Sequence, residues 1–465
     1  MKTTDELAAL VSRLRADVAD DLSRGSGYEL ASDDRRELAR ELTLSRLEQY
    51  AAESVEGGFT PLGVVDEQRV ARSVLDALFG LGRLQALIDD PEIENIDVNG
   101  CDRVWVTYAD GTKASVEPAA ESDAELAEML RSAAARFGLS ERRFDVSHPE
   151  LDLRLPDGSR LSALMSVVQR PVVSIRRHRF VDLTLDDLVE MGGLDATLAS
   201  FLAAAVRARK NIVVGGAMNS GKTTLIRALA SVIPPRERVV TIEQAFELGL
   251  DSIPDRHPDL VALEARPANA EGEGAISMAR LVRRALRMNA DRVIVGEVLG
   301  DEILPMLNAM SQGRSGSMCT IHADSSLGIF RRLASYAIQA PERLPLESTN
   351  LLIAGVVHFT VFVEVVDLER SSPDLRYLNG SDRDLLAENP ETNGIRFRAV
   401  KRRRFVSSVQ EVVGSEGLHV VSNEVFRSGR DGRAELAAPL RSSTLEELID
   451  CGFEPALRSS ETVLW

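Results

Sequence analysis

The stretch that decides the expected fold is Ile212-Val213-Val214-Gly215-Gly216-Ala217-Met218-Asn219-Ser220-Gly221-Lys222-Thr223-Thr224. It opens with a short β-rich run, and the part from Gly216 to Thr223 matches the pattern G-x-x-x-x-G-K-[ST]. A helical pattern then continues to Ala230. Glycines let the backbone curl so that successive N–H groups point at a phosphate, and the helix N-terminus adds the positive end of its dipole. The stretch therefore predicts a nucleoside triphosphate-binding loop between a strand and a helix.

The side chains of this loop predict how the nucleotide and a metal ion are held. Lys222 is one of only five lysines in the chain, and we expect it to reach the β- and γ-phosphates. Thr223 is expected to bind Mg²⁺. The other nucleotide-binding residues expected in this stretch are Gly216, Asn219, Ser220, Gly221 and Thr224.

Two glutamates that follow apolar runs are the candidate catalytic carboxylates. Residues 239–242 read Val-Val-Thr-Ile and lead into Glu243, and residues 293–296 read Val-Ile-Val-Gly and lead into Glu297. Ligands bind at the carboxyl ends of strands in open α/β sheets, so both side chains could face the nucleotide. For each glutamate alone, a solvated position at a strand end is an equally good interpretation. P-loop ATPases usually have a metal-holding Asp where this chain has Gly296.

The chain around this stretch divides into four expected parts. Residues 1–80 show helical periodicity and predict a helical leader. Residues 81–178 combine strand, hairpin and helix signals, which predict an α+β domain. Residues 179–365 alternate strands and helices, which predicts an α/β domain with a parallel sheet. Residues 366–465 predict a β-rich appendage with a closing helix near 443–450.

Composition narrows the classes of protein further. The 465 residues include 72 acidic and 55 basic ones, giving a formal net charge of −17, which disfavours a protein that binds nucleic acid over its whole surface. The three cysteines lie far apart, so neither a disulfide framework nor a zinc site is expected. We find neither a signal peptide pattern nor an apolar stretch of about 18–20 residues. The expected location is cytoplasmic, with membrane attachment only through protein partners.

Several ordered motifs resemble the type II/type IV secretion ATPase superfamily, most closely the CpaF-type tight-adherence (Tad/Flp) pilus assembly ATPase. The resemblance covers roughly residues 80–365. It rests on the phosphate loop and on the segments 93–106, 152–160, 241–247, 266–269, 281–288, 292–298 and 320–323.

The resemblance implies an α/β fold, with a RecA-like P-loop domain preceded by an α+β N-terminal domain and the helical leader. It implies ATP and Mg²⁺ as cofactors, and a homohexameric ring that works with inner-membrane platform proteins of a pilus or secretion machine. No nucleic-acid partner is expected.

When the roles of the family's motif residues are transferred to the matching positions, the resemblance implies that Glu243 is the general base or water-positioning group. Glu297 becomes the second catalytic carboxylate and holds Mg²⁺ through water. His322 stands at the position that senses the γ-phosphate. Arginine pairs bidentately with phosphate oxygens, and the N-domain arginines expected to do so are Arg154, Arg160 and Arg176.

The chain departs from the family pattern at four places. Gln244 follows Glu243 where the family has Asp, and Leu299 replaces an arginine. The phosphate loop has residues 217–219 where small residues and glycine are common. Arg314 stands where the first histidine of the histidine box is expected. Arg314 is therefore a candidate catalytic cation, although a surface position is an equally good interpretation.

Two other functions stay open at this stage. One is a catalytically degenerate ring subunit that binds nucleotide and acts as a structural or regulatory platform, and the other is a DNA-translocating ATPase of conjugation. The basic residues between 396 and 404 could contact an acidic partner or lipid headgroups. A solvated strand face is the favoured interpretation of that cluster.

Overall fold

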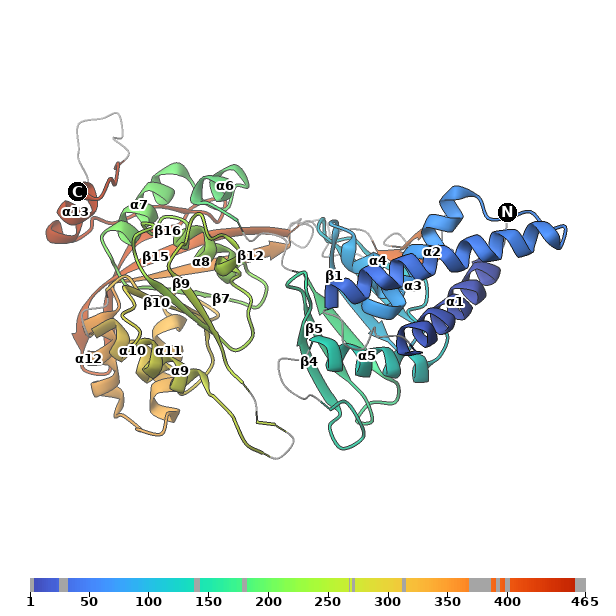
Figure 1. Cartoon of the computed structure of the whole chain (residues 1–465). Helices are drawn as coiled ribbons and strands as arrows, with labels where there is room; N and C mark the ends of the chain where they lie inside the picture. The colour runs from blue at the N-terminus through green and yellow to red at the C-terminus, as the bar shows by residue number, and fades with distance from the viewer. Residues whose placement is uncertain are drawn as a thin grey trace. The chain divides into compact units, whose positions relative to one another are not determined.

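The computed structural model describes residues 4–24, 32–137, 143–177, 182–266, 268–269, 272–311, 315–367, 386–389, 394–397 and 402–455 (Figure 1). The chain forms two compact units. The first consists of Met1–Arg177 with Ser381–Ala399, and the second of His178–Gly380 with Val400–Trp465.

The first unit combines a helical leader with an α+β domain. Its helices are α1 (Thr4–Arg24), α2 (Ser32–Glu56), α3 (Val64–Phe79), α4 (Leu84–Asp89) and α5 (Asp123–Phe137). Its strands are β1 (Ile93–Asn99), β2 (Val104–Tyr108), β3 (Lys113–Val116), β4 (Glu150–Arg154), β5 (Arg160–Leu164), β6 (Val172–Arg176), β13 (Leu386–Asn389) and β14 (Gly394–Phe397). The strands form one sheet in the order β13-β14-β3-β2-β1-β6-β5-β4, and neighbouring strands are antiparallel.

The second unit contains a nine-stranded sheet in the order β17-β16-β15-β12-β7-β11-β10-β8-β9. Its strands are β7 (Ile212–Gly216), β8 (Val239–Glu243), β9 (Leu260–Glu264), β10 (Arg292–Val298), β11 (Met318–His322), β12 (Phe359–Asp367), β15 (Arg402–Glu416), β16 (His419–Ser428) and β17 (Ala434–Leu436). Its helices are α6 (Leu185–Glu190), α7 (Ala196–Arg207), α8 (Lys222–Ala230), α9 (Met278–Ala285), α10 (Ile303–Ser311), α11 (Gly328–Gln339), α12 (Leu346–Val356) and α13 (Ser442–Asp450), with a 3₁₀ turn at Leu250–Ser252.

The central part of this sheet is parallel and covered on both faces. All five residues of β7 and all five of β8 are buried, as expected for strands between two layers of helices. Successive residues of β7 face opposite layers: Val214 packs into one core with α6, α7 and α8, and Val213 packs into the other with α9 to α12. The helices accordingly lie on two sides of the sheet in Figure 1. This three-layer α/β arrangement is the expected RecA-like P-loop domain.

The C-terminal segment, for which the sequence predicts a β-rich appendage, adds its longer described strands to the sheet of the second unit. Strand β15 pairs with β12 in an antiparallel register, and β16 and β17 extend the same sheet. The physical reason is burial: residues 359–363 of β12 are all buried, four of the five are apolar, and residues 405–412 of β15 are buried beside them. Strand β15 therefore covers what would be an exposed sheet edge. The short hairpin β13–β14 extends the first unit's sheet through β3 instead.

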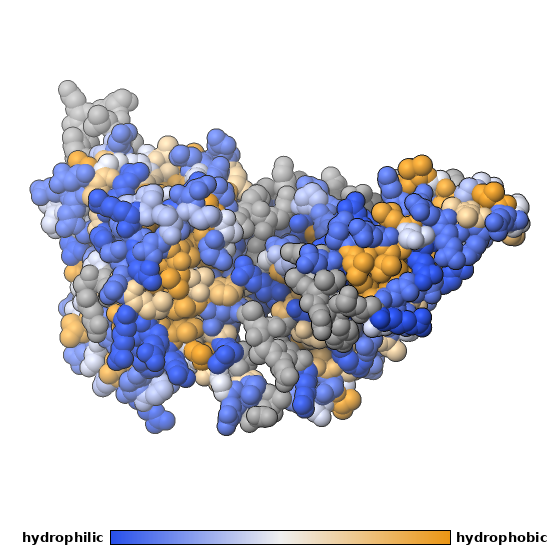
Figure 2. All heavy atoms as spheres, in the orientation of Figure 1, coloured by the Kyte–Doolittle hydropathy of each residue, from blue (hydrophilic) through white to orange (hydrophobic). Residues whose placement is uncertain are grey.

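The surface is mainly polar. On the face seen in Figure 2, hydrophilic residues predominate, and hydrophobic residues gather in small patches on both units. Within the described ranges, none of the helices has the length and hydropathy needed to cross a bilayer.

Candidate nucleotide-binding site

The phosphate loop joins the buried strand β7 to helix α8 in a strained conformation. Asn219 has a φ of 59° and Gly221 a φ of 100°, both in the left-handed region. Gly221 occupies the N-cap position of α8, where a side chain would be strained. A Cβ on Gly216 would collide with the Val363 carbonyl oxygen and the Ser220 hydroxyl. The tight turn therefore needs glycine at both positions of the motif.

Lys222 folds back over the loop and makes contact with two other expected site residues. Its Nζ donates to the carbonyl oxygens of Ala217 at 2.9 Å and Gly216 at 3.3 Å, and lies 3.2 Å from His322 Nδ1. An ammonium group can only donate, so Nδ1 accepts and the proton of His322 is on Nε2. That Nε2 lies 2.9 Å from Glu297 Oε1 and donates to it, while Lys222 Nζ is 4.0 Å from the same oxygen.

The strand order explains why these residues meet. Strands β7, β11, β10 and β8 are neighbours and run parallel, so their carboxyl ends lie at one edge of the sheet. Gly216 is in register with His322 at the ends of β7 and β11, and Val295 is in register with Ile242. The loop, His322, Glu297 and Glu243 thus come from four adjacent strand ends, the edge at which open α/β sheets bind ligands.

Glu243 is the most deeply buried carboxylate of this edge, with 3% of its surface exposed. Burial raises its pKa to about 7, although two hydrogen bonds act in the opposite direction. The backbone N–H groups of Glu247 and Leu248 both donate to its Oε1, at 2.9 and 2.8 Å. A carboxyl group with such a pKa exchanges a proton near neutral pH.

Sequence reasoning missed two residues that hold Glu243 in place. Arg227 of α8 is buried and donates to the carbonyl oxygens of Glu247 and Leu248, which fixes the segment whose N–H groups bind Glu243. Gly296 leaves room for the Glu243 side chain, because a Cβ there would lie 2.9 Å from Glu243 Cγ. The absence of the usual metal-holding Asp at position 296 therefore has a steric explanation, because only glycine leaves space for Glu243. No local motif identifies either role.

The first unit brings its three expected arginines into one row. In the antiparallel register Arg154 of β4 lies opposite Arg160 of β5, and Arg160 lies opposite Arg176 of β6. Directly opposed residues point to the same face of a sheet, and Arg160 and Arg176 are exposed. Like charges in such a row repel one another, so the row favours binding of an anion.

The remaining expected residues are placed only in part. Thr223 and Thr224 lie in the first turn of α8, next to the loop, and are partly exposed. Ser220 is buried, and its hydroxyl group has no hydrogen-bond partner among the residues that the structure describes. Arg314 lies outside the described residues. In the part of the chain that is described, no group of three His, Cys, Asp or Glu side chains could hold a metal by itself.

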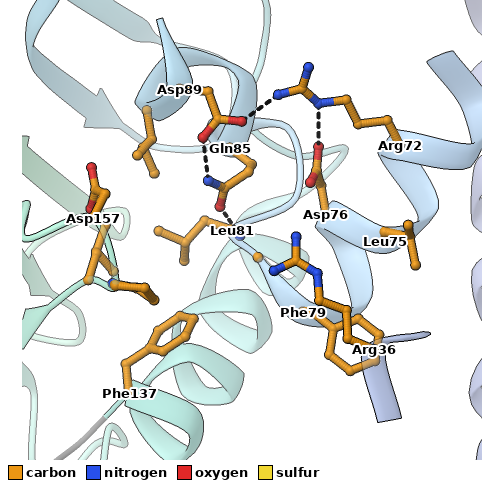
Figure 3. A pocket seen from close by; sticks show the side chains of 14 residues that line it. Arg36, Arg72, Leu75, Asp76, Phe79, Leu81, Gln85, Asp89, Phe137 and Asp157 are labelled. Atoms are coloured by element: carbon orange, nitrogen blue, oxygen red, sulfur yellow. Dashed lines mark hydrogen bonds and ion pairs between the residues drawn. The ribbon is translucent and has the colours of Figure 1, made fainter. Parts of the chain in front are cut away.

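The first unit also contains a pocket of about 340 Å³ (Figure 3). Helices α2 to α5 and the turn between β4 and β5 line it. Arg72 pairs with Asp89 at 2.5 Å and with Asp76 at 3.8 Å, and Gln85 donates to Asp89 at 2.8 Å. Because most of its charged groups pair with one another, the pocket does not select one class of ligand.

Comparison with known proteins shows which proteins this chain is similar to. The family model described as type II/IV secretion system protein matches residues 79–372. The putative conjugal transfer protein Rv3659c of Mycobacterium tuberculosis is 36% identical over 257 residues, which cover 53% of this chain and 70% of that protein. The type IV secretion system protein VirB11 of Brucella suis is 31% identical over 332 residues, covering 64% and 89% of the two chains. The crystal structure of the Brucella suis VirB11 ATPase with sulphate is 28% identical, covers 62% and 92%, and has a TM-score of 0.32.

The buried Glu243 gives a prediction about stability and pH. Its pKa in the folded protein, about 7, lies above the ordinary value of 4.5, so the folded state binds more protons and this group lowers stability as pH rises from 4.5 to 7. Glu243→Gln should therefore raise the free energy of unfolding by about 1–3 kcal/mol at pH 8 and by much less at pH 5. Urea titrations followed by circular dichroism would measure this, with substitution of an exposed glutamate in the same unit, Glu347→Gln, as the control. A difference that is equal at the two pH values would contradict the assignment.

Proposed function

This chain belongs to the type II/IV secretion system protein family, and we propose that it is a hexameric ATPase motor for Tad/Flp-type pilus assembly or a related type II/IV secretion process. The single observation that supports this most is the convergence of Lys222, His322 and Glu297 at adjacent strand ends. Lys222 supplies a cation beside the phosphate loop, His322 links it by hydrogen bonds to Glu297, and Glu297 supplies a carboxylate. This set of groups suits the transfer of a phosphoryl group to water.

The loop residues fit a bound nucleotide with Mg²⁺. Lys222 is held by two loop carbonyl groups, and we infer that it exchanges these partners for the β- and γ-phosphates. Thr223 would ligate Mg²⁺, and Glu297 would hold that ion through water. The metal would neutralise part of the charge that develops on the phosphate oxygens.

The proton of the attacking water needs an acceptor, and Glu243 is the residue that we propose. It is held rigidly by the backbone of the segment after it, and its pKa of about 7 suits a base that works at neutral pH. Breaking of the bond between the β–γ bridging oxygen and the γ-phosphorus would release ADP, while the water oxygen becomes part of inorganic phosphate. His322, bonded to both Lys222 and Glu297, would transmit the presence of the γ-phosphate to the carboxylate.

The row of Arg154, Arg160 and Arg176 supports a role for the first unit. In the register of this sheet the three arginines lie opposite one another, and a bound anion would reduce the repulsion between their like charges. We infer that they reach the phosphates of a nucleotide in the assembled ring, as an arginine that stabilises developing charge does in other phosphoryl-transfer enzymes.

The proposed location is cytoplasmic, at the inner membrane, through platform proteins of a pilus or secretion machine. The VirB11 relative is named as a type IV secretion system protein, which supports a role in such a machine. The putative conjugal transfer protein raises DNA transfer as an alternative. The net charge of −17 argues against direct binding of DNA.

A second candidate function is a nucleotide-binding ring subunit that turns over slowly. The observation in its favour is the burial of Glu243, which accepts the N–H groups of Glu247 and Leu248 on the same oxygen, together with the exposed Gln244 beside it.

An ATPase assay separates the two functions. Lys222→Ala should abolish turnover because it removes the cation at the phosphates, and Glu297→Gln should lower kcat by about a hundredfold or more. Lys113→Ala, which removes a half-exposed lysine of the first unit, is the control and should keep wild-type activity. Wild-type turnover equal to the Lys222→Ala background, with nucleotide binding preserved, would support the slow subunit instead.

The proposed base predicts the pH dependence of the reaction. A base works as the carboxylate, so kcat/KM should fall about tenfold for each pH unit below the pKa of about 7 and level off above it. The residual activity of Glu243→Gln should lose this dependence. A wild-type profile that is flat between pH 6 and 8 would show that Glu243 is not the base.

A further inference from the structure

Strand β15 brings a cation to the phosphate loop from almost two hundred residues further along the chain. Arg404 Nε donates a hydrogen bond of 2.9 Å to the carbonyl oxygen of Asn219. The arginine stem passes the next glycine, since a Cβ on Gly221 would lie 3.6 Å from Arg404 Cδ. The side chain therefore lies along the outer side of the loop.

The register of the sheet explains this reach. Gly216, the last residue of β7, is opposite Val363 of β12, and Val363 is opposite Val406 of β15. Arg404 lies two residues beyond that row, opposite Val365. It thus stands past the end of β7, where the chain has left the sheet to form the loop. The contact depends on β15 being part of this sheet, which the sequence did not predict.

The hydrogen bond from Arg404 holds the Asn219–Ser220 peptide group, on which the conformation of the loop depends. Asn219 is a non-glycine residue with a φ of 59°, a conformation that costs about 1–3 kcal/mol. In a trans peptide the C=O and the following N–H point in opposite directions. Arg404 holds the Asn219 carbonyl on one side of the peptide, so the Ser220 N–H points to the other side, where it donates a hydrogen bond of 3.3 Å to the Ala217 carbonyl oxygen in this nucleotide-free loop.

We propose that Arg404 is a positioning residue of the phosphate loop: its guanidinium group fixes the Asn219–Ser220 peptide so that the Ser220 N–H faces the bound phosphate. The inference rests on the proposed function, because it assumes that the loop binds a nucleotide. A hydrogen bond from a charged donor is about twice as strong as a neutral one, which suits an outside support for a strained turn. Strand β15, which contains Arg404, is the next strand in the chain after β14, and β14 belongs to the sheet of the first unit.

The neighbouring Arg403 provides a matched control. Its guanidinium group pairs with Asp431 at 3.3 Å and lies 5.4 Å from the centre of the Phe405 ring. Arg403 and Arg404 are adjacent on one strand and have the same charge, yet only the Arg404 side chain has a hydrogen bond to the loop.

The test compares Arg404→Gln, Arg404→Lys and Arg403→Gln in the full-length protein. Steady-state ATPase kinetics give kcat and KM, and titration with Mg²⁺-ADP gives the Kd. Arg404→Gln should raise KM and Kd about tenfold, the effect of losing one charge-assisted hydrogen bond, while kcat changes less than twofold. Arg404→Lys should recover part of the loss, and Arg403→Gln should match the wild type. The melting temperature without nucleotide should be the same for the wild type and the two Arg404 variants, because Arg404 is exposed.

Three outcomes of this experiment would contradict a proposal. If Arg404→Gln keeps the wild-type KM and Kd, or if Arg403→Gln weakens binding equally, the positioning role is wrong. If kcat falls while KM is unchanged, Arg404 acts on the reaction and not on the loop, which also overturns the proposal. If the wild-type protein itself does not bind Mg²⁺-ADP, the proposed function fails, and this outcome is distinct from a failure of Arg404 alone.

Discussion

The contact of Lys222 with His322 and Glu297 is the interaction on which the candidate site depends. The three side chains are separated by 25 to 100 residues in sequence, and they meet because β7, β11 and β10 are parallel neighbours whose carboxyl ends share one edge. A parallel sheet with helices on both faces therefore does more than bury a core. It fixes where a cation, a relay and a carboxylate lie relative to a loop of backbone N–H groups.

Close packing of backbone at this edge sets the second constraint. Gly216 and Gly296 each stand where a Cβ would meet neighbouring atoms, one at the turn into the loop and one beneath Glu243. Arg227 then holds the segment after Glu243 through its carbonyl oxygens. Gly296 and Arg227 thus allow the Glu243 side chain to be buried, and this burial raises its pKa.

The sequence predicted the parts of the site that local patterns encode. The loop motif and the strand-end rule pointed to the loop, Glu243 and Glu297, and the family resemblance added His322. The structure has all of them at adjacent strand ends. The roles of Arg227 and Arg404 depend on how strands pair across the sheet, which no spacing in the sequence reveals. The sequence predicted a β-rich C-terminal segment but not its partner strand, because the pairing of β15 with β12 is non-local.

The most direct measurement is a structure of the assembled protein with Mg²⁺ and a non-hydrolysable ATP analogue. We expect that Lys222 Nζ leaves the Ala217 carbonyl oxygen and binds the β- and γ-phosphates. We also expect that at least one of Arg154, Arg160 and Arg176 lies within about 3 Å of a phosphate oxygen. Phosphates bound away from the loop, with Lys222 still on Ala217, would contradict the central claim. All three arginines pointing to solvent would contradict the role of the first unit.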